Sequence, residues 1–60
     1  MRITPATQAR NNVGLTLKQA ARRARVGDSY LRRIELHGGA SYVLAQRLAR
    51  LYQCSIHVFL

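Results

Sequence analysis

The chain has 60 residues, enough for one small domain, and 48% of them are apolar, which favours a compact core over a disordered tail. Ten lysines and arginines stand against two acidic residues, and the resulting net charge of +8 favours polyanionic partners. A single cysteine excludes an internal disulfide and a cysteine-rich zinc site, and no apolar run approaches the roughly 20 residues of a membrane span. The N-terminal stretch MRITPATQAR lacks the apolar region of a signal peptide, so we expect a cytoplasmic protein.

Helical start and stop signals recur along the chain, and no segment shows the alternation of a strand. The first helix is predicted over about 5–13, with Thr4 as its cap and a proline at its first position. The second opens at Thr16, where Gln19 completes a capping box, and continues to residue 24. One face of this second helix carries only small side chains, which lets a neighbouring helix approach closely: Ala20, Ala21 and Ala24.

A short turn over 25–27 separates the second helix from a third, predicted over about 28–36. Gly27 is a tolerated N-cap, and Asp28 in the first turn complements the helix dipole. The third helix is amphipathic, with Val26, Leu31 and Ile34 toward the core and Ser29, Arg32 and Arg33 outward.

The remaining chain is predicted to form a fourth helix and a last short helical turn. Gly38 and Gly39 end the third helix, and Ser41 caps a fourth that runs to Tyr52. Its inner stripe is expected to consist of Tyr42, Ala45, Leu48, Ala49 and Tyr52. The last turn begins at Ser55, and we expect Ile56, Phe59 and an inert Cys54 in the core.

Several of these residues stand in the register of a known family. An arginine, a glycine four positions later and a Leu-Thr pair appear as Arg10, Gly14, Leu15 and Thr16, and an Ile-Glu pair ends the third helix at 34–35. Together with the leucine- and alanine-rich fourth helix, they resemble the Cro/CI-type helix-turn-helix family, often called the XRE family. The resemblance covers nearly the whole chain. It implies one all-α domain over 1–60, a compact five-helix lambda-repressor-like fold with the helix-turn-helix at its second and third helices.

A few positions depart from the family pattern. Arg25 stands where the turn usually has glycine, so a left-handed backbone there would be strained by about 1 kcal/mol. Leu17 replaces a glutamine that often contacts phosphate, and Gln53 replaces a common glycine. His37 also replaces a glycine, and the loop to the fourth helix is about one residue short. These departures keep the core positions and affect the phosphate contacts.

The resemblance implies that the third helix enters the major groove of DNA. Carried over position by position, it makes Asp28, Ser29 and Arg33 the leading base readers. Arg33 suits the two acceptors of guanine, a pair worth roughly 1–3 kcal/mol, and Asp28 can accept from cytosine. Arg32 is expected on a phosphate or on a base at the edge of the site. For Tyr30, contact with DNA and a place in the core are weighed equally.

Phosphate contacts are expected at the start of the second helix, from its later arginines and from the loop before the fourth helix. The candidates are Thr16, Lys18, Arg22, Arg25, Gly39 and Ser41, with Arg2 on the flanking DNA backbone. The resemblance also implies a partly buried salt bridge between Arg10 and Glu35, which has a structural role and ties the first helix to the third.

The last segment is more apolar than a small domain can bury by itself. We expect His57, Val58 and Leu60 to contact a second copy. Such a homodimer would hold two recognition helices about 34 Å apart, one DNA turn, and would bind a palindromic operator. The alternative is that these residues only close the domain and that dimers form on DNA alone.

The predicted function is sequence-specific binding of double-stranded DNA as a transcriptional repressor or autoregulator, in the compact format of phage and plasmid regulators. Activation through contact with RNA polymerase is an alternative. Others are a protein-interaction module on the same scaffold, such as an antitoxin or anti-regulator, and a nonspecific nucleoid or RNA-binding protein. No enzyme, cofactor or metal site is expected, because Ser29 lacks the partners of a catalytic triad and His37 and His57 lack a cluster of metal ligands.

Overall fold

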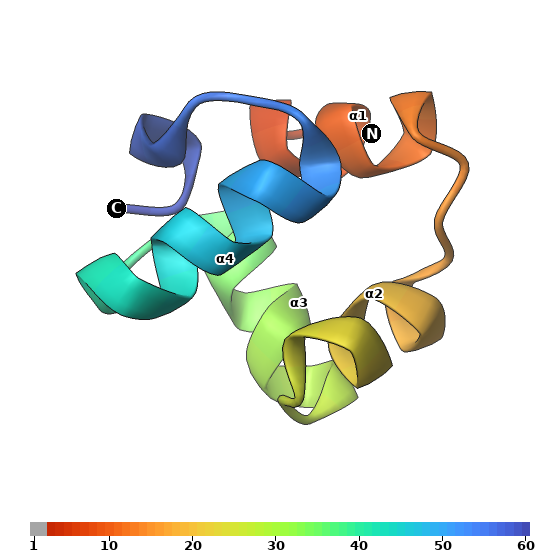
Figure 1. Ribbon diagram of the computed structural model, residues 1–60, viewed down its shortest axis with the longest axis horizontal. Coiled ribbons are helices and arrows are strands. Elements are labelled where there is room, and N and C mark those ends of the chain that lie inside the picture. Colours follow the sequence, from red (N-terminus) through yellow and green to blue (C-terminus); the bar gives the residue numbers. More distant parts are fainter. Residues whose placement is uncertain (1–2) are drawn as a thin grey trace.

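The computed structural model describes residues 3–60, which form four α-helices and a closing 3-10 turn (Figure 1). The elements are α1 (Pro5–Asn12), α2 (Leu17–Ala24), α3 (Asp28–His37), α4 (Tyr42–Tyr52) and η1 (Ile56–Val58). The all-α prediction is confirmed, but the count of five helices is not. The last segment closes only bonds from one residue to the third before it, Val58 N–H to the Ser55 carbonyl and Phe59 N–H to the Ile56 carbonyl, because it is too short for α-helical turns.

Each α-helix begins directly after the residue that is predicted to cap it. The side chains of Thr4, Thr16 and Ser41 accept hydrogen bonds from backbone N–H groups three residues later. Gln19 returns a bond to the Thr16 N–H at 3.0 Å and completes the capping box. Gly27 precedes α3 in an extended conformation and makes no side-chain cap. The helix starts are therefore fixed by local sequence.

Helices α2 and α4 both end at a non-glycine residue in the left-handed conformation. Arg25 has φ 60° and ψ 44°, and Gln53 has φ 55° and ψ 51°. The next N–H along the chain then bonds back to the helix, from Val26 to the Ala21 carbonyl and from Cys54 to the Ala49 carbonyl, each at 3.0 Å. Both sites are positions where the family commonly has glycine, and each costs about 1 kcal/mol in backbone strain.

The core lies where the four helices and η1 meet. Its largest side chains are Leu31, Ile34, Leu48, Tyr52 and Phe59, all 2% exposed or less. The rings of Tyr52 and Phe59 pack edge to face with their centroids 5.4 Å apart. The small face of α2 is fully buried as predicted, which lets its neighbours pack close to its backbone: Ala20, Ala21 and Ala24.

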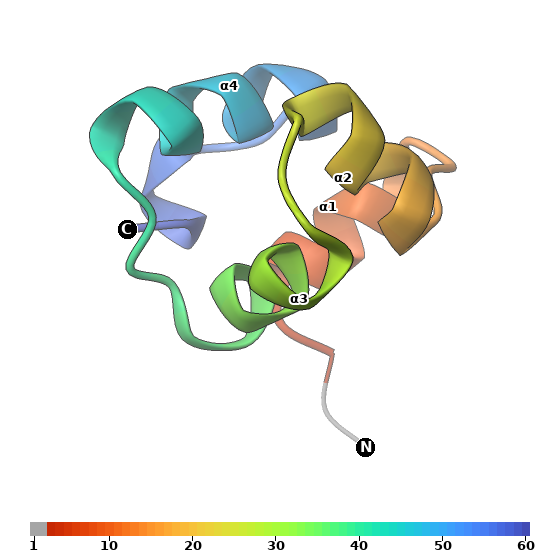
Figure 2. The ribbon, with the colours of Figure 1, turned by 90° about the horizontal axis from the view of Figure 1, so that it is seen from below.

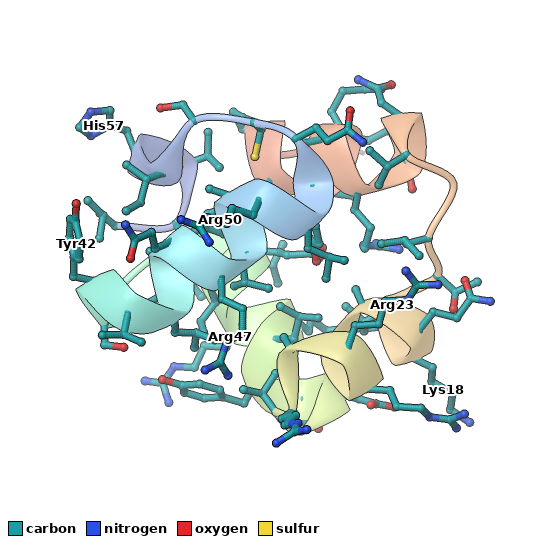
Figure 3. All side chains as sticks on the ribbon, viewed as in Figure 1. Lys18, Arg23, Tyr42, Arg47, Arg50 and His57 are labelled. Atoms are coloured by element: carbon teal, nitrogen blue, oxygen red, sulfur yellow. The ribbon has the colours of Figure 1, made fainter. Side chains whose placement is uncertain are left out.

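Several side chains, among them Tyr42, Ala49, Cys54 and Ile56, are less buried than predicted. Tyr42 was expected in the core and is 63% exposed, which makes that prediction wrong (Figure 3). It is the first residue of α4, and helical side chains tilt toward the N-terminus, so its ring extends past the end of the helix. Cys54 and Ile56 pack against the core but stay partly exposed. Partial burial still raises the pKa of the Cys54 thiol.

The C-terminal residues pair with the loop before α4. The N–H groups of Gly39 and Ala40 donate to the carbonyls of Leu60 and Phe59, each at 3.0 Å. Gly38 has φ +75°, and a Cβ there would lie 3.2 Å from the Leu60 carbonyl oxygen. This loop is therefore fixed by backbone bonds to the other end of the described chain. None of the described helices has the length and apolarity to cross a membrane.

Candidate nucleic-acid interface

Helix α3 lies at the surface with one side in the core and the other facing solvent. Its buried side consists of Leu31, Ile34 and Glu35. Figure 2 shows α3 on one side of the molecule and α4 on the other. Because the buried side of α3 faces the interior, its polar side points away from α4. The turn over 25–27 that leads into α3 is the helix-turn-helix connection predicted from the sequence.

The three predicted base readers all lie exposed in the first two turns of α3. Ser29 and Arg33 are four residues apart and therefore share one face, and Asp28 and Arg32 share the adjacent one. This face offers a hydroxyl, a carboxylate and two guanidinium groups, which can match the donors and acceptors at base edges. Tyr30 is 48% exposed, so the alternative that placed it in the core is wrong.

Sequence reasoning missed one residue on this face. Leu36 is 53% exposed, three positions after Arg33 and seven after Ser29, and so lies on the same side of α3. The signal was present in the sequence as helical spacing. The side chains predicted on the outward face are polar, and Leu36 adds an apolar group to it.

A groove of about 590 Å³ separates the starts of α2 and α3. It brings two predicted phosphate contacts next to the predicted readers, and its lining is Thr16, Leu17, Lys18, Asp28, Ser29 and Arg32. The lysine and the arginine supply positive charge from two helices. Leu17, which departs from the family pattern, adds apolar surface to this lining.

The other predicted phosphate contacts do not line this groove. Arg22 and Arg25 are exposed at the end of α2, and Ser41 is exposed at the start of α4. The Gly39 N–H already donates to the Leu60 carbonyl, so it does not offer the free donor that we expected in this loop. No local sequence signal marks that pairing. Arg2 lies outside the described residues.

The electrostatic character of the surface is strongly positive. Of the two carboxylates in the chain, Asp28 is exposed on α3 and Glu35 is 5% exposed in the core. Within residues 3–60, no group of three His, Cys, Asp or Glu side chains is placed to hold a metal ion. Long-range attraction to a polyanion is thus opposed on the surface by a single carboxylate.

A buried polar cluster around Glu35 holds α3 in place. Arg10 Nε on α1 lies 2.9 Å from Glu35 Oε2 and forms the ion pair that the resemblance implied. Thr7 donates to Oε1 at 2.9 Å, and the Tyr52 hydroxyl of α4 donates to Oε2 at 2.5 Å. Burial, followed by the hydrogen bond to Glu35, raises the pKa of Tyr52 well above its usual range. The cluster joins α1, α3 and α4, and sequence reasoning found only Arg10 among the three partners.

Comparison with known proteins agrees with this geometry. A family model described as Helix-turn-helix matches residues 7–59, which include most of α1 and all of α2, α3, α4 and η1. Comparisons with curated proteins and with solved structures give no significant match. The family match covers most of the chain, including both helices of the motif and the acidic residue that anchors α3. The chain therefore belongs to the XRE family of helix-turn-helix DNA-binding regulators.

Proposed function

We propose that the protein is a transcriptional repressor or autoregulator that binds a palindromic operator as a homodimer. The observation that carries the proposal is the exposed face of α3, where Ser29 and Arg33 project from a helix packed firmly on its opposite side. The net charge of +8 supplies attraction to DNA without sequence preference, and this face supplies the discrimination.

Each side chain on this face has a distinct role in the proposal. Arg33 donates two hydrogen bonds to guanine, and Asp28 accepts one from cytosine. Ser29 donates or accepts according to the base. Arg32 contacts a phosphate or an edge base, and Leu36 packs on a thymine methyl group, a contact that apolar side chains make in the major groove.

The sugar-phosphate backbone is held by residues around the groove and on the loop. Thr16 and Lys18 bind it at the start of α2, and Arg22 or Arg25 bind it at the end of that helix. Ser41 contributes through its hydroxyl at the start of α4. These contacts fix the register of α3 in the groove and carry no base preference themselves.

The proposed homodimer contact lies at the end of the molecule that carries η1. Figure 3 shows Tyr42 and His57 projecting at the same end. Tyr42 is 63% exposed and Leu60 is 51% exposed, which leaves apolar surface there for a second copy. Val58 is partly buried against the core and contributes less. Two-fold symmetry then sets the two α3 helices about one DNA turn apart.

Selection from random duplex DNA at physiological salt tests this proposal. The wild-type protein should enrich a palindrome, and Arg33→Ala should relax the preference at one position of each half-site by about 5- to 150-fold, equivalent to 1–3 kcal/mol. As a matched control, Lys18→Ala should weaken all sequences alike and reduce the slope of log affinity against log salt by about 1 per monomer. Recovery of no enriched sequence would refute the proposal.

A further inference from the structure

A second groove lies between α2 and α4. It has a volume of about 490 Å³, and its lining is Arg23, Val43, Gln46, Arg47, Arg50 and Leu51. Positions 43, 46, 47 and 50 follow the spacing of one helix face, the solvent-facing side of α4. Arg23 reaches the groove from the last turn of α2. Figure 3 shows Arg23, Arg47 and Arg50 on the near side of the molecule.

This α2–α4 groove is separate from the DNA interface. It contains no residue of α3 and shares none with the groove at the starts of α2 and α3. Figure 2 shows α4 on the side of the molecule opposite α3. The base-reading face of α3 points away from α4, and the phosphate contacts proposed at the end of α2 and the start of α4, Arg22, Arg25 and Ser41, border the α2–α4 groove without lining it.

The groove carries positive charge without a compensating group. None of its three arginines forms a salt bridge with a residue in the part of the chain that the structure describes. Asp28 and Glu35, the two carboxylates of the chain, lie in the other groove and in the core. Arg47 Nη1 donates to the Ala24 carbonyl at 3.2 Å, which holds this guanidinium between the two helices and leaves its other N–H groups for a ligand.

The groove also carries apolar surface among its arginines. Val43 is 66% exposed at the start of α4, and Leu51 is partly exposed near its end. A DNA backbone would satisfy the guanidinium groups and leave these aliphatic side chains in contact with phosphate and sugar. A peptide that carries both carboxylates and aliphatic side chains complements both kinds of surface, and carboxylates fit the guanidinium fork in bidentate pairs.

We propose that the α2–α4 groove binds an acidic amphipathic helix of a partner protein. Carboxylates of that helix pair with Arg23, Arg47 and Arg50, and an aliphatic side chain packs on Val43 and Leu51. This is helix-in-groove recognition with charge complementarity added. The proposal does not depend on operator binding, because no predicted base reader lines the groove.

The test uses fluorescence anisotropy with a labelled amphipathic peptide of about 15 residues, long enough to form helix, that carries glutamates on one face and leucines on the other. The full chain should bind it at physiological salt. A matched peptide with glutamine in place of glutamate should bind at least about tenfold more weakly, as should the variant Arg23→Gln/Arg50→Gln. Val43→Ser should weaken binding about fivefold through lost apolar contact. Arg47 is left unchanged because it bonds to the end of α2.

The matched control removes the same charge from the opposite face. Arg32→Gln/Arg33→Gln should keep the affinity for the peptide within about twofold, allowing for the lower net charge. Equal loss in both double variants would mean a general charge effect and would overturn the proposal. It would also be overturned by no peptide binding, by an unchanged affinity in Val43→Ser, or by loss of duplex DNA binding instead of peptide binding in Arg23→Gln/Arg50→Gln. Operator selection is measured separately, so failure here leaves the function of α3 standing.

Discussion

The buried cluster around Glu35 leads to a sharp prediction for Glu35→Ala. The carboxylate is 3% exposed as a side chain and accepts from Arg10, Thr7 and Tyr52. Its removal leaves Arg10, whose side chain is 14% exposed, without its carboxylate, and it leaves the Tyr52 hydroxyl without an acceptor. Breaking a buried ion pair from one side costs about 3–5 kcal/mol.

That cost is large for a domain of this size. At roughly 0.05–0.15 kcal/mol per residue, the whole free energy of unfolding is about 3–9 kcal/mol. We therefore expect Glu35→Ala to be largely unfolded at 25 °C or to lose at least about 12 °C in melting temperature, at about 4 °C or more per kcal/mol. Asp28→Ala is the matched control, because it removes the other, exposed carboxylate and should cost at most about 1 kcal/mol.

Urea unfolding followed by circular dichroism measures these free energies. A double-mutant cycle with Arg10→Met and Glu35→Leu should give a coupling energy of about 1–3 kcal/mol, because removal of both charges leaves neither buried without a partner. The reasoning fails if Glu35→Ala unfolds within about 1 kcal/mol of the wild type, or if the coupling energy is close to zero.

Two further predictions concern backbone strain and alkaline pH. Arg25→Gly and Gln53→Gly should each raise the free energy of unfolding by about 0.5–1 kcal/mol, because glycine adopts the left-handed conformation without strain; a lower melting temperature in either variant would contradict this. Because the pKa of Tyr52 is raised in the folded state, its hydroxyl stabilises the fold fully below the unfolded pKa of about 10. This stabilisation is lost as the pH rises from that value toward the folded pKa. Urea titrations at rising pH should show this loss in the wild type and a flatter slope in Tyr52→Phe; equal slopes would contradict the assignment.

Local signals allowed most of the fold to be predicted. Caps at Thr4, Thr16 and Ser41 are decided within one turn of chain, so helix starts followed from sequence. The exposed position of Tyr42 could not be predicted in this way. Helical periodicity places it near the inner stripe, and only the folded structure shows that its side chain is left uncovered at the start of α4. Periodicity describes a helix face, and burial also requires a neighbour.

Contacts between segments that are distant in the sequence could not be predicted either. The outward placement of Ser29 and Arg33 follows from helical spacing, and the prediction that they read bases rests on the family resemblance. By contrast, the hydrogen bond from Tyr52 to Glu35 and the α2–α4 groove require the relative placement of three helices. Single-sequence patterns carry no information on such distances, so these features became visible only in the folded chain.

The pairing of Gly39 and Ala40 with the C-terminal residues has a mechanical consequence. These two hydrogen bonds join the loop that leads into α4 to the segment that carries Leu60. Pulling Leu60 away breaks the same bonds that keep Ser41 at its place at the start of α4. Amide hydrogen exchange at Gly39 and Ala40 therefore reports how tightly the C-terminal end is closed. In the proposed dimer, a contact that holds Leu60 in place would therefore also stabilise the start of α4, where Ser41 is proposed to contact DNA.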